Sequence, residues 1–459
     1  MGAESHRDRP FAPIDGPLGS FIDFKNGKSS PDRIDSGEFP VYGSNGLIGR
    51  ADLTNSMAGT LIVGRVGSYC GSVHYSPVRC WVTDNAIVGT SKSPSDSRFW
   101  YYKLRSLNLN NHRSGSGQPL LNQQILNTIP VSVPATSDAR AQIARVLGAL
   151  DDKVEVNFRI NKTLEAITQA IFKSWFVDFD PVKAKIAAKA EGRDPLRAAM
   201  GAISGKSDAE LNNLPPEQQA QLAAVSELFP DEMEESEAGK IPKAWHAVTF
   251  GSMLTHTIGG DWGTETPDAS NDTRVAIIRG TDLPELDQAQ LNRVPIRYTS
   301  QKKLATRCMK VGDLILEVSG GSRDQPTGRS FRMTANAMRE FDCPVEPASF
   351  CRLLRPDSLE IGVILGLHLS YIYQQGKTWE YQNQSTGIAN FQTAHFLNAE
   401  LVTRPSAAVA EAFFKIVNPL LERRHDPQGK QLSGLRDTLL PQLLSGELQV
   451  QNIGAEAAV

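Results

Sequence analysis

Several catalytic signatures are missing from this sequence of 459 residues. It has no G-x-x-x-x-G-K-[ST] phosphate loop, no H-E-x-x-H zinc motif and no G-x-S-x-G nucleophile motif. The stretch Asn418-Pro419-Leu420 lacks the second proline and the aromatic residue of an adenine methyltransferase clamp. These absences predict that the chain has no catalytic residues, no metal site and no cofactor of its own.

Long apolar runs and paired cysteines are also missing. No run of about 18 apolar residues occurs, which predicts a protein without a membrane-spanning helix. The five cysteines are odd in number and include no C-x-x-C pair, which argues against a disulfide framework or a zinc site. We therefore expect a cytoplasmic protein in a reducing compartment.

The net charge of −3 gives little sign of a nucleic-acid partner when it is averaged over the chain. The acidity is concentrated in residues 177–240, which end in the like-charge run 231–237. The charge of the whole chain therefore does not exclude DNA as a partner. We expect this Ala-, Glu- and Pro-rich segment to be an exposed linker with some helix around residues 216–228, and much of the rest to be mobile.

The sequence contains an internal repeat. Residues 18–27 share a Gly-Ser pair and a later glycine, at equal spacing, with residues 250–259. Residues 59–67 and 312–320 each begin and end with glycine around a short apolar run, which predicts a buried strand between two glycine turns. Because these strand signals are short and punctuated by glycine, each copy is predicted to be an α+β unit.

Helical periodicity follows each copy, after Pro134 in the first and Pro405 in the second. Apolar residues then recur with a period of 3.6, first over residues 143–176 and again over residues 413–444. The two stripes predict an antiparallel helix pair related by a pseudo-twofold axis. Pro419 and Pro441 fall inside the second helical region, where we expect a kink or a break.

Glycine-rich loops supply the candidate binding residues. Arg, Asn, Gln, Ser and Tyr side chains on such loops can hydrogen-bond to phosphates and base edges. An alternative is that these loops are ordinary soluble turns. The candidates for DNA binding are Tyr42, Ser44, Asn45, Arg65 and Ser68 in the first copy, and Arg279, Arg323, Tyr381 and Gln384 in the second.

Three stretches carry a resemblance to a known family. They are residues 39–49 together with 59–67, the Trp-Phe-Val-Asp-Phe-Asp-Pro stretch within residues 171–182, and residues 239–245. With the repeated layout, the chain resembles the specificity subunit of a type I restriction–modification system. The resemblance covers nearly the whole chain.

This resemblance implies an architecture of two target-recognition domains separated by two conserved helical regions. Each domain would read one half of a split target in double-stranded DNA. The implied boundaries are a first recognition domain at 1–136, a helical spacer at 137–177, an acidic linker at 178–240, a second recognition domain at 241–405 and a second helical spacer at 406–459.

The resemblance also implies partners. Two methyltransferase subunits would dock on the helical regions, restriction subunits would join that core, and S-adenosylmethionine would bind to the methyltransferase. An alternative function is a self-contained DNA methyltransferase or nuclease with attached recognition domains. The candidate subunit contacts lie on the apolar stripes and are Ile171, Trp175, Phe176, Leu439, Leu443 and Leu444.

Overall fold

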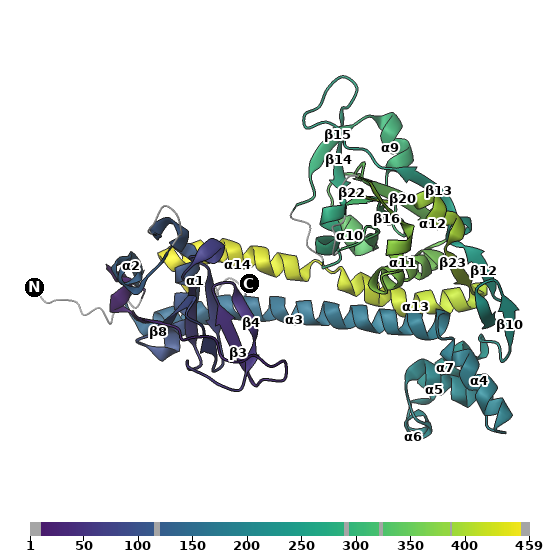
Figure 1. Cartoon of the computed structure of the whole chain (residues 1–459), viewed down its shortest axis with the longest axis horizontal. Helices are drawn as coiled ribbons and strands as arrows, with labels where there is room; N and C mark the ends of the chain where they lie inside the picture. The colour runs from purple at the N-terminus through teal and green to yellow at the C-terminus, as the bar shows by residue number, and fades with distance from the viewer. Residues whose placement is uncertain (1–10, 114–119, 289–292, 321–324, 386–387, 451–459) are drawn as a thin grey trace, which may run out of the picture. The chain divides into compact units, whose positions relative to one another are not determined.

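The computed structural model describes the chain except residues 1–10, 114–119, 289–292, 321–324, 386–387 and 451–459 (Figure 1). The chain folds as two compact units. Unit 1 comprises residues 1–155 and 431–459, and unit 2 comprises residues 156–430. Each unit combines helices with small sheets, so the predicted α+β class is confirmed.

Unit 1 contains a four-stranded antiparallel sheet with the strand order β2-β8-β5-β6 and a three-stranded sheet with the order β4-β3-β7. A separate pair, β1 with β9, joins the two ends of the copy. The strands are β1 Pro13–Pro17, β2 Ile22–Asn26, β3 Phe39–Gly43, β4 Gly46–Ala51, β5 Thr60–Gly64, β6 Val73–Ser76, β7 Trp81–Val82, β8 Ala86–Ser91 and β9 Pro130–Pro134. The helices are η2 Leu18–Ser20, η3 Gly67–Tyr69, η4 Pro94–Asp96, α1 Ser97–Ser106, η5 Leu109–His112 and α2 Gln123–Thr128.

Unit 2 repeats this arrangement and adds to it. Its four-stranded sheet has the order β13-β20-β16-β18, its three-stranded sheet β15-β14-β19, and its joining pair is β12 with β23. The strands are β12 His246–Thr249, β13 Leu254–Gly259, β14 Thr273–Ile278, β15 Ile296–Thr299, β16 Leu314–Glu317, β17 Ser319–Gly320, β18 Ser330–Arg332, β19 Val345–Pro347, β20 Cys351–Pro356, β21 Gln382–Ser385, β22 Ile388–Phe391 and β23 Leu401–Arg404. The helices are η6 Phe250–Met253, η7 Gly280–Asp282, α8 Leu283–Leu286, α9 Gln301–Arg307, α10 Ala335–Arg339, α11 Leu359–Gln374, η8 Lys377–Tyr381 and α12 Thr393–Ala399.

The pairing geometry of the two copies matches strand by strand. In the sheets β4-β3-β7 and β15-β14-β19 the central strand pairs antiparallel with the following strand and parallel with a later one. The predicted glycine turns are also present, because Gly59 and Gly312 adopt φ angles of +81° and +94° before the buried strands β5 and β16. Glycine is favoured there because side chains are strained in that region. The repeat predicted from the sequence is therefore an architectural duplication.

Long helices contribute to both units. Helix α3 spans Ser137–Phe176, α13 spans Ala407–Arg424 and α14 spans Gln428–Ser445 (Figure 1). In unit 1, Arg436 of α14 pairs with Asp151 of α3 at 2.7 Å, and Leu443 shares a core with Leu147. As the sequence number rises along α3, it falls along α14, so these segments are antiparallel.

The same antiparallel packing occurs within unit 2. Arg424 of α13 pairs with Glu165 at 2.9 Å, while the rings of Phe413 and Phe176 lie 4.8 Å apart. Helices α13 and α14 continue through Pro419 and Pro441, and the helix is interrupted instead at residues 425–427. The prediction of a break at either proline was therefore wrong.

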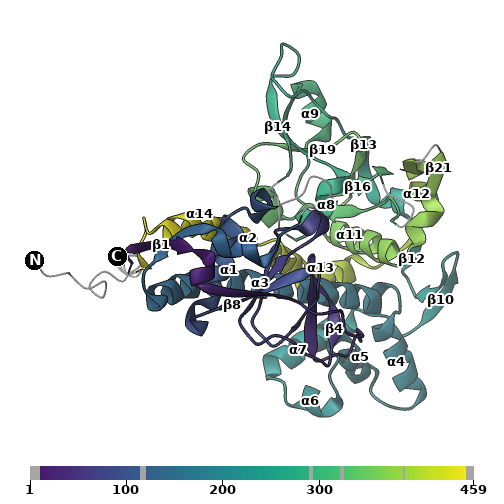
Figure 2. The ribbon, with the colours of Figure 1, turned by 60° about the vertical axis from the view of Figure 1, so that its left-hand side comes forward.

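The acidic segment is more ordered than the sequence analysis predicted. Four helices and a hairpin occupy it: α4 Asp180–Ala190, α5 Pro195–Ser204, α6 Asp208–Asn212, α7 Pro216–Glu227, β10 Met233–Ser236 and β11 Gly239–Pro242 (Figure 2). The expected helix at 216–228 is confirmed by α7. The others form because Asp194 caps α5 and Ser207 with Glu210 forms a capping box at α6. The acidic run at 231–237 is thus part of a hairpin, where Asp231 and Glu232 pair with Lys189 and Lys243.

Candidate nucleic-acid interface

A hydrogen-bonded turn in unit 1 gathers three loops at one end of its sheets. The N–H of Ala86 donates to the carbonyl of Thr83 at 3.0 Å, closing a turn with Asp84 and Asn85 at its tip. Thr83 N–H donates to Tyr42 O at 2.8 Å, and Arg65 N–H donates to Asn85 O at 3.0 Å. The turn therefore fixes the positions of the loops that carry Tyr42 and Arg65.

Unit 2 builds the same turn from different residues. Cys351 N–H donates to Ala348 O at 2.8 Å, with Ser349 and Phe350 at the tip. Ala348 N–H donates to Ile278 O at 2.8 Å, and Val318 N–H donates to Phe350 O at 2.9 Å. We call residues 83–86 and 348–351 the paired turns.

Further main-chain bonds extend this correspondence. Gly27 N–H donates to Ala86 O at 3.1 Å in unit 1, and Gly260 N–H donates to Cys351 O at 3.0 Å in unit 2. A Cβ atom at Gly27 would lie 2.0 Å from Thr83 O, and one at Gly260 would lie 2.1 Å from Pro347 O. Glycine is therefore required at both places, because any side chain would collide with the backbone that leads into the turn.

The correspondence shows which residues stand in equivalent positions. Arg65 matches Val318, since their carbonyls accept hydrogen bonds from Leu121 N–H and Phe391 N–H at 3.0 and 2.9 Å. Asn85 matches Phe350 by the bonds described above. The frame is thus common to the two copies, whereas the side chains that it displays differ in charge and polarity.

Comparison with known proteins shows which proteins this chain is similar to. Residues 15–166 match the type I restriction modification DNA specificity domain. The HindI specificity subunit of Haemophilus influenzae is 29% identical over 365 residues, which are 73% of this chain and 72% of that protein. The MjaIX specificity subunit of Methanocaldococcus jannaschii is 20% identical over 372 residues, covering 78% of this chain and 70% of that protein. The chain is therefore similar to type I restriction–modification specificity subunits over about three quarters of its length.

A solved structure has a similar fold. The S subunit of a type I restriction–modification system from M. genitalium superimposes with a TM-score of 0.56 at 14% identity. The match covers 95% of this chain and 97% of that protein. At this level of identity the likeness shows the shared fold, including its duplicated layout.

The first copy brings three of its five candidate residues, Tyr42, Ser44 and Arg65, to the turn at 83–86. Ser44 Oγ donates to the carbonyl of Asn85, and Ser72 Oγ donates to Ser44 O at 2.5 Å. Asn45 and Ser68 are exposed, and Arg65 is half-buried with its Nε atom unpaired among the described residues. Tyr42 packs against the small core of Ile62, Cys80 and Val82, and burial raises the pKa of its phenol. Tyr42, Ser44 and Arg65 are thus hydrogen-bonded to the turn at 83–86, Tyr42 and Arg65 through main-chain atoms and Ser44 through its hydroxyl.

The candidates in the second copy lie differently. The guanidinium of Arg279 donates hydrogen bonds to the carboxylate of Asp282 and to the carbonyl oxygen of Arg293. The bonds to Asp282 raise the pKa of Arg279. Arg323 lies outside the described residues. Gln384 belongs to strand β21, but its side chain is also outside them.

Tyr381 is a correction to the sequence prediction. Its side chain is buried, and its hydroxyl donates to Glu400 Oε2 at 2.5 Å. Glu400 also pairs with His368 at 2.8 Å and Lys377 at 2.7 Å. Tyr381 therefore belongs to the core of unit 2, because an aromatic residue can bury its ring when its hydroxyl finds a partner.

This network predicts a pH dependence for the stability of unit 2. Burial alone would raise the pKa of Glu400, but bonds from His368, Lys377 and Tyr381 outweigh it and hold the pKa at about 2. The stabilisation is therefore present above about pH 4.5 and is lost as the pH falls towards 2. The free energy of unfolding can be measured with urea at a series of pH values. For the parent it should fall by about 2–3 kcal/mol between pH 4.5 and 2, whereas for Glu400→Gln this decrease should be absent.

A matched control is Glu411→Gln, because Glu411 forms an exposed pair with Lys415 on α13. Its pH profile should follow that of the parent. If Glu400→Gln and the parent lose equal stability between pH 4.5 and 2, the hydrogen-bonded carboxylate does not control this transition.

The six proposed subunit contacts are covered by the chain itself. Trp175 and Phe176 are buried in the core of unit 2, and Leu443 and Leu444 are buried in that of unit 1. Ile171 and Leu439 pack against these cores and are partly buried. The prediction that these stripes face a partner was therefore wrong for the four buried residues, since their side chains already have neighbours within the chain. The large apolar residues left exposed on the long helices are Val156, Phe158, Ile160, Ile167, Ile416 and Leu435.

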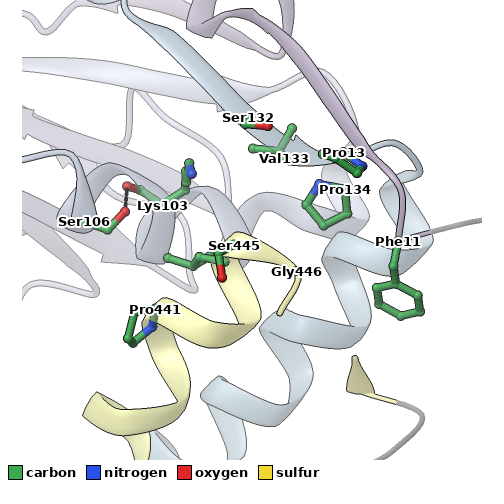
Figure 3. A pocket seen from close by; sticks show the side chains of 11 residues that line it. Phe11, Pro13, Lys103, Ser106, Ser132, Val133, Pro134, Pro441, Ser445 and Gly446 are labelled. Carbon is green, nitrogen blue, oxygen red and sulfur yellow. Dashed lines mark hydrogen bonds between the residues drawn. The ribbon is translucent and has the colours of Figure 1, made fainter. Parts of the chain in front are cut away.

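One hollow of unit 1 has no lining residue from the paired turn at 83–86. It has a volume of about 400 Å³ and lies between α1, the pair β1–β9 and the end of α14 (Figure 3). Of the eleven residues that line it, Lys103 alone is ionisable, and burial lowers its pKa. In the part of the chain that the structure describes, no cluster of three His, Cys, Asp or Glu residues could hold a metal ion, and no helix is long and apolar enough to cross a membrane.

Proposed function

We propose that this chain is a specificity subunit that reads a bipartite DNA target, one half with each copy of its duplicated fold. The observation that carries the proposal is the pair of turns at 83–86 and 348–351, which share one main-chain frame and display different side chains. A common frame presents both sets of side chains in the same way. Different side chains then select different bases, because each base pair offers its own pattern of donors, acceptors and methyl groups in the major groove.

The chemistry of the restriction–modification system is assigned to the partners. The specificity subunit has no catalytic residues, carries no cofactor and directs two methyltransferase subunits, which bind S-adenosylmethionine, together with restriction subunits. Docking is proposed on the exposed apolar residues of the helical regions, among them Phe158, Ile160 and Ile167, since exposed apolar groups on helices favour protein contacts. The recognition domains are proposed at residues 1–136 and 241–405, joined through helical spacers at 137–177 and 406–459 and the acidic segment at 178–240.

A domain exchange tests this proposal. Residues 11–134 are replaced by the matching domain of a related specificity subunit, and the assembled methyltransferase complex is expressed in cells whose DNA methylation is then mapped. We expect one half of the methylated sequence to change completely, while the other half and the spacing between them stay the same. The reason is that the exchange replaces one turn and its loops and leaves the other copy intact.

The reciprocal exchange of residues 246–404 is the control, and it should change the other half alone. A change of both halves in either exchange would contradict the assignment of one reader to each copy. Retention of the whole motif would show that these units do not recognise sequence.

A further inference from the structure

In each of the paired turns, the two residues at the tip are exposed and the two residues that flank them are buried. Asp84 and Asn85 are exposed between buried Thr83 and Ala86. Ser349 and Phe350 are exposed between buried Ala348 and Cys351. The phenyl ring of Phe350 is 64% exposed, so the frame holds an uncovered aromatic ring where the other copy holds an amide.

The neighbours of Phe350 are also less polar than those of Asn85. Val318 stands beside it in the place of Arg65, as the equivalent hydrogen bonds show. Trp262, two residues beyond the frame glycine Gly260, is 38% exposed and lies under the guanidinium of Arg297 at 4.8 Å. A single exposed apolar residue is ordinary on a protein surface. Here, however, two neighbouring positions are both apolar in the second copy and polar in the first, Phe350 in place of Asn85 and Val318 in place of Arg65.

Base edges offer one apolar feature in the major groove, the C5-methyl group of thymine. Apolar side chains, including phenylalanine, contact that methyl group, whereas asparagine forms paired hydrogen bonds with adenine. We infer that Phe350 is a specificity-determining residue that contacts a thymine methyl group in the second half-site, while Asn85 hydrogen-bonds to a base edge in the first. This inference rests on the proposed function.

The test removes the methyl group from the DNA and the ring from the protein. The target is first defined by mapping methylation with the parent complex. Each thymine of the second half-site is then replaced, one at a time, by deoxyuridine, and binding of the complete complex is measured for the parent and for Phe350→Ala. We expect one replacement to weaken binding by the parent about fourfold, the effect of one buried methyl group. Phe350→Ala should bind the unmodified target at least fourfold more weakly and should not respond to deoxyuridine at that position.

Two controls separate the contact from other effects. Leu359→Ala removes another exposed apolar side chain of unit 2, beyond the opposite end of strand β20, and should bind like the parent. Asn85→Ala should weaken discrimination in the first half-site and leave the deoxyuridine response of the second intact.

Several outcomes would overturn the inference. They are parent-like binding by Phe350→Ala, a deoxyuridine response that persists in Phe350→Ala, an equal weakening of all DNA sequences, and a second half-site that contains no thymine. All of these leave half-site recognition by the parent complex in place. If the parent itself does not discriminate between DNA sequences, the proposed function fails instead.

Discussion

Trp175→Ala should destabilise unit 2 by about 3–5 kcal/mol, the usual cost of truncating a large buried aromatic side chain. Trp175 is 1% exposed, and its ring lies 4.8 Å from that of Phe229 and 5.5 Å from that of Phe413. Its removal leaves a cavity between α3, α13 and the end of the acidic segment. Equilibrium unfolding by urea, followed by circular dichroism, measures the change in the free energy of unfolding.

The control for this variant is Ile167→Ala on the same helix. Ile167 is 42% exposed, so its truncation should cost less than about 1 kcal/mol. Suppose that Trp175→Ala keeps the stability of the parent but loses the methyltransferase subunit. Trp175 would then be a docking residue, and its burial within the chain would not describe the assembled protein.

Asp96→Ala should destabilise unit 1 by about 3–5 kcal/mol, because it leaves the guanidinium of Arg140 buried without its carboxylate. The two side chains are 0% and 8% exposed and pair at 2.7 Å. Asp96 also accepts hydrogen bonds from Ser91 Oγ at 2.6 Å and Trp100 Nε1 at 3.1 Å. The pair therefore joins the start of α3 to β8 and α1, and urea unfolding should report its loss.

Asp152→Ala is the matched control, because Asp152 pairs with Arg98 at 2.7 Å but is 67% exposed. An exposed pair of this kind contributes at most about 1 kcal/mol. Equal losses for Asp96→Ala and Asp152→Ala would show that burial does not determine the strength of the first pair. Replacing Asp96 and Arg140 together with apolar residues should restore much of the stability, since no charge is then left buried and unpaired.

The duplication could be predicted because its signals are local. The glycines at 59 and 312 and the apolar runs behind them have equal spacing, and both runs became buried strands. That Asn85 and Phe350 occupy equivalent positions could not be predicted from spacing in the sequence. Helix α10 and longer connections separate β16 from the second turn, so the spacing from the strand to the turn differs between the copies.

Some of the candidate binding residues turned out to be held by partners within the chain. Loop composition singled out Asn45 and Arg65, whose role in binding stays a prediction. It did not reveal that Asp282 pairs with Arg279 or that Tyr381 is buried with its hydroxyl bonded to Glu400. Asp282 lies three residues after Arg279 in the same loop, whereas Glu400 lies 19 residues after Tyr381. The Asp-Asn pair at 84–85 carried a usable signal, because such residues favour turns.

The apolar stripes show a second limit. Periodicity predicted the helices and their antiparallel packing, yet it does not say what covers an apolar face. The aromatic residues of 172–176 are covered by Phe229, Trp245 and Phe413. Phe413 lies on the second apolar stripe, as the predicted helix pair requires, whereas Phe229 comes from the acidic segment and Trp245 from the start of the second copy. The periodicity of the helices does not predict these last two neighbours.

The frame of the paired turns has a consequence for evolution. Main-chain atoms form its hydrogen bonds, and the two tip side chains of each turn point away from the core as exposed residues. Mutations at the tips should therefore change the stability of the fold very little. Selection for stability then does not restrict which side chains occupy these positions. If residues 85 and 350 read bases as inferred above, point mutations there change the target sequence while the protein stays folded.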